Sequence, residues 1–390
     1  MSTEFADFAD AMARPARPAD VPARAFGRVA VLGGGTDARL LAAVALSEGA
    51  EVTLFSAYGA ELSALRSAGG IALRGAGPIG SYQIDSDAAP SVKTTAELDA
   101  AVAGAELIFL TGPVHKQRTY AMVLADHLSD GQVLVLAPAR TMGALEARWL
   151  LKIGGCTADV TLVEAAAMPF WTDAGGAALT LSAAAPAPVA TLPAGRTDVV
   201  EGLRPFLPNL VLALSVMHSG FADASGLIEV ATLALGGPAL APGGPTIPMG
   251  GQPLAENQTF RNLIGEDHLA VIRAMAEERR ETARRFGVRD LPDCDAWLDM
   301  FAGAPSGAGA RPVPDRAHAT ALIRCAVTGS LVPLTSAARI AQVATPATDG
   351  MIALASALLG ADLATAGRTL GAVGIGGDID TARRALEEAV

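Results

Sequence analysis

Cysteine is scarce in this sequence, and long uninterrupted hydrophobic runs are absent. The three cysteines, Cys156, Cys294 and Cys325, are scattered and have neither a CxxC partner nor histidines at metal-ligand spacing. We therefore expect a reduced, cytoplasmic protein that holds no metal. Apolar stretches such as Ala165–Leu181 are broken by Pro, Asp and Gly before the ~20 residues that a transmembrane helix requires. No association with a membrane is expected.

Charged residues are also few, at 18% of the chain, and basic residues are the minority. The 29 Lys and Arg residues face 40 Asp and Glu residues, which gives a net charge of −11. No basic run interleaved with aromatic residues is present, so nucleic acid is not an expected partner. A surface with so little charge favours a buried subunit interface, and we expect a homodimer.

The length of 390 residues and the hydrophobic content of 51% indicate two domains, each with its own core. Residues 1–27 contain acidic residues and prolines and are predicted to form a flexible N-terminal arm. Over residues 28–197, short β-branched runs alternate with alanine-rich amphipathic stretches, the pattern of a parallel sheet built from strand-helix units. The predicted strands are Val29–Leu32, Glu51–Phe55, Leu107–Leu110, Val133–Leu136 and Thr161–Glu164, with further sheet strands in the stretch LSAAAPAPVATLPAGRTDVV.

Residues 198–390 have helical periodicity and few strand signals, which predicts an all-α C-terminal domain. The predicted helical segments are Ser219–Leu235, His268–Phe286, Ala317–Val327, Ser336–Ala344 and Thr348–Leu359.

A glycine turn, Gly33-Gly34-Gly35-Thr36, follows the first predicted strand and opens a predicted helix. With Ala38 it fits the G-x-G-x-x-[GA] pattern, in which the first glycine permits the turn and the second lets a diphosphate approach the backbone. The small third residue packs helix against strand, and the diphosphate lies at the helix N-terminus. The first domain is therefore predicted to be a Rossmann-type dinucleotide-binding domain.

Ser56 stands at the end of the second predicted strand, where an NAD-binding site usually has Asp or Glu for the ribose 2′-hydroxyl. Without that carboxylate a 2′-phosphate is not repelled, so we expect NADP(H). No arginine follows closely in sequence to clamp that phosphate, since the nearest is Arg66. NAD(H) therefore remains the alternative coenzyme.

Three further stretches are informative: LTGPVHKQRTYAMVLADHLSDGQVLVLAPARTMGALE, VEAAAMPFW and GSLVPLTSAARIAQVATPATDGMIALASALLGADLATAGRTLGAVGI. They resemble the octopine/nopaline (opine) dehydrogenase family, and the resemblance runs from about Arg28 to Ile375. Pro138-Ala139-Arg140 stands where the family has Pro-Gly-Arg. The resemblance implies a Rossmann domain joined to a helical domain, and the reduction of an imine formed between an amino acid or amine and a 2-oxo acid. It also places Gly112, Pro113, His115 and Pro138 along the coenzyme cleft.

The stretch SVMHSGFADASGLIE resembles the catalytic segment of that family, so His218 is the predicted proton carrier. Arg324 and Arg140 are the candidates for binding a substrate carboxylate, because arginine pairs with carboxylates in a bidentate way. The other histidines in predicted helices, His127, His268 and His318, are predicted to be solvated or to cap helices.

The sequence departs from the family at Cys325-Ala326, where family members have a Glu-Asp pair. An altered amine partner is one consequence, and two other functions stay open. One is a reductase of a 2-oxo or 3-oxo acid to a hydroxy acid, although its usual catalytic lysine is missing from the helical domain. The other is a dinucleotide-binding protein without catalysis.

Overall fold

The computed structural model describes residues 23–87, 90–174, 178–236 and 258–389. Most of the predicted N-terminal arm lies outside these residues. Its last part is not free, because Arg24 N donates to the carbonyl of Asp198 (3.0 Å) and the buried Phe26 ring packs on Phe206. Residues 23–27 therefore belong to the folded domain, which corrects the predicted end of the arm at residue 27.

An eight-stranded sheet forms the centre of the first domain, in the order β12-β11-β8-β7-β6-β1-β2-β5. The six strands from β8 to β5 are parallel, whereas β11 runs antiparallel to β8 and β12 runs parallel to β11. The strands are β1 Arg28–Leu32, β2 Glu51–Phe55, β5 Lys93–Thr95, β6 Leu107–Leu110, β7 Val133–Leu136, β8 Thr161–Ala165, β11 Ala187–Leu192 and β12 Leu210–Leu212. All five predicted strands are confirmed to within one residue.

Helices cover both faces of this sheet, because the central strands are apolar on both sides. In β1, Val29 and Val31 pack toward one face, and Ala30 and Leu32 toward the other. On the first face lie α2 Thr36–Ser47, α3 Gly59–Ser67 and α7 Thr197–Leu203; on the second lie α4 Leu98–Val102, α5 Val114–Leu124 and α6 Gly143–Ile153.

The sheet domain extends past residue 197, where the sequence predicted its end, since α7 and β12 both belong to it. The apolar run of only three residues in β12 gave no clear strand signal. The predicted boundary is corrected to the residues that precede α8 Val216–Ala222.

A second sheet, in the order β4-β3-β10-β9, was not predicted. Its strands are β3 Gly70–Gly75, β4 Gly80–Gln83, β9 Phe170–Asp173 and β10 Leu179–Ala183. The pairing of β10 with β3 joins segments about a hundred residues apart, which no local pattern reveals. This sheet brings β9 to the edge of the cleft described below.

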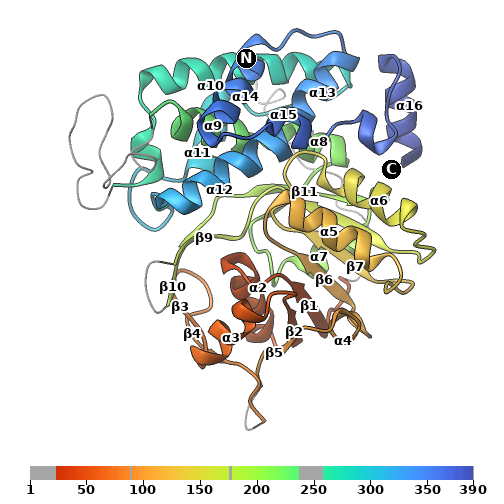
Figure 1. The fold of residues 1–390 in the computed structure, drawn as a ribbon, viewed down its shortest axis with the longest axis vertical. Coiled ribbons are helices and arrows are strands. Elements are labelled where there is room, and N and C mark those ends of the chain that lie inside the picture. Colours follow the sequence, from red (N-terminus) through yellow and green to blue (C-terminus); the bar gives the residue numbers. More distant parts are fainter. Residues whose placement is uncertain (1–22, 88–89, 175–177, 237–257, 390) are drawn as a thin grey trace, which may run out of the picture.

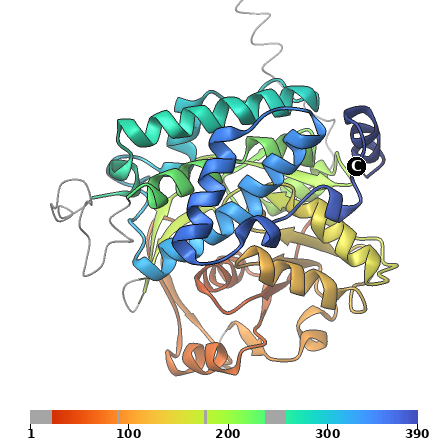
Figure 2. The ribbon, with the colours of Figure 1, turned by 45° about the horizontal axis from the view of Figure 1, so that its top comes forward.

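The C-terminal domain is helical, as predicted, and in Figure 1 it lies above the sheet domain. After α8 come α9 Ser225–Ala234, η2 Phe260–Leu263, α10 Glu266–Arg285, α11 Cys294–Ala302, α12 Arg316–Ala326, η3 Val327–Leu331, α13 Val332–Ile340, α14 Pro346–Leu359, α15 Leu363–Ala366, η4 Gly371–Val373 and α16 Ile379–Ala389. The apolar α9 is buried on all sides, and Figure 2 shows the long α10 (teal) along the top of this domain.

The elements α12, η3 and α13 form one continuous helix, Arg316–Ile340, with a π-helical turn at η3. It is long and apolar enough to be a candidate membrane span, but 78% of its most apolar window is buried inside the protein. Such burial is typical of a core helix.

Candidate active site

The glycine turn joins β1 to α2 as predicted. Gly33 has a φ of 134°, and a Cβ there would collide with Thr111 Oγ1, so only glycine fits. The Ala38 methyl group packs beside Gly33. Gly35 is the N-cap of α2, and among the described residues no side chain caps this helix end. Apart from the neighbouring residues, none of them comes within 4 Å of a Cβ built on Gly35. The helix N-terminus thus faces open space, which fits a diphosphate.

A cleft of about 650 Å³ extends from this turn to the helical domain. The predicted site residues that line it are Gly33, Gly34, Gly35, Thr36, Gly112, Pro113, Pro138 and Arg140. Residues of β9, of the 311–315 loop and of α12 line its other side. The cleft therefore lies at the carboxyl ends of β1, β6 and β7, where ligands bind in open α/β sheets.

His218, the predicted proton carrier, is not among the described residues that line this cleft. It lines a separate cavity of about 150 Å³ with Ala222 and Asp290, and its Nε2 lies 4.0 Å from the Asp290 carboxylate. The reason is helical phase: Ser219 in α8 faces the sheet domain and donates to Glu164 Oε1 (2.8 Å). His218, one residue earlier, is turned to a different side of the helix.

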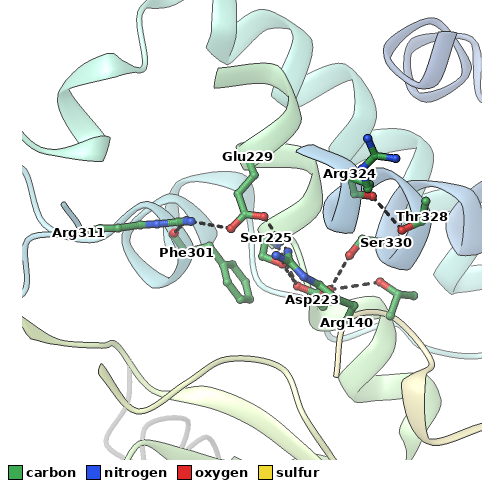
Figure 3. A network of polar contacts seen from close by, with 10 residues as sticks. Arg140, Asp223, Ser225, Glu229, Phe301, Arg311, Arg324, Thr328 and Ser330 are labelled. Carbon is green, nitrogen blue, oxygen red and sulfur yellow. Dashed lines mark hydrogen bonds and ion pairs between the residues drawn. The ribbon is translucent and has the colours of Figure 1, made fainter. Parts of the chain in front are cut away.

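Arg324 and His115 also lie outside the lining of the cleft, contrary to prediction. Both are exposed, and Figure 3 shows the Arg324 side chain directed away from Arg140. Part of the His115 side chain is nevertheless removed from water. This desolvation and the cations of Lys116, Arg324 and Arg118 lower the pKa of His115.

Arg140 is the predicted carboxylate-binding residue that the structure does place in the cleft. It is buried and lies in the turn after β7, and its Nη1 donates to Ser225 Oγ and to Glu229 Oε2, both at 2.8 Å. The other oxygen of Glu229 accepts from Arg311 Nη2 at 2.6 Å (Figure 3). Two guanidinium groups therefore share one buried carboxylate.

Electrostatics favour the ionised forms of Glu229 and Arg140. Burial opposes the charge of Glu229, but Arg140 and Arg311 outweigh it and lower the pKa of Glu229. Burial likewise disfavours the charge of Arg140, yet Glu229 and Asp223 raise the pKa of Arg140. Burial lowers the pKa of Arg311, with Glu229 opposing the effect.

Asp223 joins this cluster to both domains. Its carboxylate accepts from Ser225 N (3.0 Å), from Ser330 Oγ (3.0 Å) and from Thr141 Oγ1 (3.3 Å). Asp223 therefore holds Ser225, and Ser225 Oγ accepts from Arg140.

His318 is exposed near the start of α12, in agreement with the predicted solvated position, and it also lines the cleft near Arg311. Only its backbone has a capping role, since His318 N donates to Asp315 Oδ1 at the start of α12. The ring is open to the cleft, and partial removal from water together with the Arg311 cation lowers the pKa of His318.

A carboxylate does lie beside the glycine turn, although Ser56 at the end of β2 suggested that this position had none. Ser56 Oγ donates to Glu61 Oε2 (2.5 Å), and a Cβ on Gly34 would collide with the Glu61 side chain. Lys116, which lines the cleft, forms an ion pair with Glu61 Oε1 at 3.3 Å. The first turn of α3 carries this acid back to the end of β2, so the acid is five residues further along the chain than expected.

Sequence reasoning missed Glu61, Glu229, Arg311 and His318. A signal existed for Glu229, because it is the single acidic residue in the otherwise apolar helix α9. Arg311 lies in a loop without periodicity, and its location depends on the tertiary fold alone.

No protein-family model matches the chain. The opine dehydrogenase of Arthrobacter sp. (strain 1C) is 24% identical over 361 residues, which are 89% of this chain and 95% of that protein. The predicted resemblance to opine dehydrogenases is confirmed.

Solved structures of opine dehydrogenases have the same fold. Octopine dehydrogenase in complex with NADH and agmatine superposes with a TM-score of 0.67 at 16% identity, over 92% of this chain and 98% of that one. Yersinopine dehydrogenase with NADP+ bound superposes with a TM-score of 0.58 at 13% identity, over 94% of this chain and 98% of that one. The Rossmann domain followed by a helical domain is thus confirmed.

Proposed function

We propose that this chain is an NAD(P)H-dependent opine dehydrogenase. It joins an amine or amino acid to a 2-oxo acid by reducing their imine, and it catalyses the reverse oxidation. One observation carries the proposal: the cleft that starts at the glycine turn ends at two buried guanidinium groups, those of Arg140 and Arg311, which share the Glu229 carboxylate. The likeness to an opine dehydrogenase along nearly the whole chain supports it.

The coenzyme fits the residues at the turn. The open N-terminus of α2 and the backbone of Gly34 and Gly35 would hold the diphosphate, while Gly112, Pro113 and Pro138 would line the path of the nicotinamide. When bound, the reduced nicotinamide supplies the hydride.

Arg140 and Arg311 orient the 2-oxo acid by its carboxylate. Both arginines line the cleft, and a guanidinium group binds a carboxylate through two parallel hydrogen bonds. Since the cluster is buried, this attraction is stronger than it would be in water.

His318 moves the proton in our proposal. Its lowered pKa keeps the imidazole neutral near pH 7, so it accepts a proton from the ammonium group of the amine substrate. The freed amine attacks the oxo carbon, and the imidazolium returns the proton to the hydroxyl that leaves as water. The imine carbon then accepts the hydride.

For the coenzyme we propose NAD(H) as the preferred form, although Ser56 alone favoured NADP(H). The Glu61 carboxylate beside Gly34 would accept hydrogen bonds from a ribose 2′-hydroxyl and would repel a 2′-phosphate. Lys116 shares that carboxylate and offers a partner to a 2′-phosphate, so NADP(H) binds more weakly but is not rejected outright.

The test is a panel of amines and 2-oxo acids, supplied together and singly, with NADH or NADPH oxidation followed by absorbance. Oxidation that needs both substrates supports the proposal. Oxidation by an oxo acid without an amine would instead identify a hydroxy-acid-forming reductase, and tight coenzyme binding without oxidation would identify a non-catalytic protein. We also expect the protein to be a homodimer in the cytoplasm. Light scattering on the purified protein tests the dimer.

A further inference from the structure

Arg368 spans the contact between the two domains. It follows α15 in the helical domain and is 2% exposed. Its Nε donates to Glu146 Oε2 of α6 in the sheet domain at 2.8 Å. Its Nη1 donates to the carbonyl of Thr141 and lies 3.5 Å from that of Ala139. These carbonyls flank Arg140 on both sides.

The turn that carries Arg140 needs external support. Arg140 and Met142 have φ values of 60° and 61°, a left-handed conformation that costs a residue with a side chain on the order of 1 kcal/mol or more. Such a conformation persists only where surrounding groups enforce it. Arg368 supplies this support, because one guanidinium binds carbonyls on both sides of the strained residue.

A second segment of the helical domain grips the same turn. The carbonyl of Gly329, in the π-helical turn η3, accepts from Thr141 N at 3.0 Å and lies 3.4 Å from Arg368 Nη1. A Cβ on Gly329 would lie 3.0 Å from Arg140 Cβ, so η3 packs directly on the Arg140 side chain. Arg368 N donates to the Thr328 carbonyl at 2.8 Å, which ties Arg368 to η3.

Glu146 fixes the guanidinium of Arg368 from the other side. Its second oxygen accepts from Arg118 Nε at 2.7 Å, and Arg118 Nη1 donates to the Ala366 carbonyl at 2.8 Å. Burial would raise the pKa of Glu146, but Arg368 and Arg118 outweigh it and lower that pKa. The carboxylate therefore stays ionised and holds Arg368 in place.

We propose that Arg368 is a positioning residue that sets the direction in which Arg140 presents its guanidinium to the substrate carboxylate. This inference rests on the proposed function, since it concerns the carboxylate subsite of that reaction. Arg368 does not line the cleft and acts only through the backbone of residues 139–141.

The test compares Arg368→Met and Arg368→Lys with Glu278→Ala as the matched control. Glu278 accepts from Ala347 N, Thr348 N and Thr348 Oγ1, so its loss weakens the helical domain without touching the Arg140 turn. For Arg368→Met we expect KM for the 2-oxo acid to rise about tenfold, the cost of one misplaced hydrogen-bonding cation, with Kd for NADH unchanged. For Arg368→Lys we expect a KM between those of wild type and Arg368→Met. Added guanidinium ion, at a non-denaturing concentration, should restore the wild-type KM in Arg368→Met.

A folded Arg368→Met variant with the wild-type KM would overturn the inference, and so would an equal rise of KM in Glu278→Ala. Hydrogen exchange of the Thr141 amide is measured alongside, because it needs no turnover. If wild type turns over no substrate pair, the proposed function fails, whereas faster exchange at Thr141 in Arg368→Met alone still supports the positioning role. Unchanged exchange at Thr141 overturns it.

Discussion

Arg140 Nη1 lies 2.8 Å from Glu229 Oε2, and this ion pair joins the sheet domain to the helical domain inside the cleft. Eighty-nine residues separate the two in sequence. Because Arg311 binds the second oxygen of Glu229, one buried carboxylate forms ion pairs with two guanidinium groups. The cluster is thus a structural joint between the domains and, in our proposal, the receptor for a substrate carboxylate.

Glu229→Gln is expected to destabilise the protein by about 3 kcal/mol, because removing one member of a buried ion pair leaves uncompensated charge. Here two guanidinium groups would lose their carboxylate. Urea unfolding monitored by circular dichroism measures the loss. Combining Glu229→Gln with Arg311→Met should cost less than the sum of the two single changes, and strict additivity would contradict the shared pairing.

His318→Asn is expected to lower kcat for imine formation and reduction by about a hundredfold, the usual contribution of a general acid-base group. His218→Asn is the matched control, and it should stay close to wild type because His218 lines a different cavity. Steady-state kinetics over pH 5–9 measure both variants. A large loss in His218→Asn with a near-normal His318→Asn would reverse the assignment.

The main sheet could be predicted from sequence because its strands are continuous β-branched and aliphatic runs buried on both faces. In Leu107–Leu110 and Val133–Leu136 every residue is buried, and both limits were predicted to the residue. In the second sheet the signal is weaker, because β4 Gly80–Gln83 has no buried residue and the pairing of β10 with β3 joins distant segments.

The site divides in the same way. The glycine turn could be predicted because its chemistry is local: a left-handed glycine, an open helix end and a small residue one turn later. His218 was misplaced because a resemblance in sequence does not fix which side of a short helix faces the cleft. Glu61 was missed since its position depends on how α3 folds back onto β2.

Glu61→Gln is expected to weaken NADH binding by about tenfold and to leave NADPH binding equal or stronger. The neutral amide keeps the size of the side chain but removes the charge that repels a 2′-phosphate. Quenching of coenzyme fluorescence gives Kd for both forms. Lys116→Met should weaken NADPH binding and leave NADH binding equal or stronger. The reason is that Lys116, the ion-pair partner of Glu61, is the cation offered to a 2′-phosphate. Equal losses for both coenzymes in both variants would remove this pair from coenzyme selection.

Glu164 provides a prediction for stability against pH. Burial raises the pKa of this carboxyl to about 7 from its ordinary value of 4.5, although hydrogen bonds from Ala144 N and Ser219 Oγ oppose the rise. Between these two pH values the folded chain keeps a proton that the unfolded chain has lost. The stability contributed by protonated Glu164 is therefore complete below pH 4.5 and is lost as the pH rises through 7.

Glu164→Gln should remove this part of the pH dependence, because the amide stays neutral throughout. We expect the variant to match wild type near pH 5 and to be more stable by roughly 3 kcal/mol at pH 8, the equivalent of about two and a half pKa units. Urea unfolding at pH 5, 6.5 and 8 measures the slope. Asp37, whose pKa burial raises to about 6, leaves a residual slope of the same sign in both proteins.

Glu201→Gln is the control. The hydrogen bond from Arg204 lowers the pKa of Glu201, so the stability that ionised Glu201 contributes is lost only as the pH falls below this range. Glu201→Gln should keep the wild-type slope, and a Glu164→Gln variant that also kept it would show that the buried carboxyl is ionised at neutral pH.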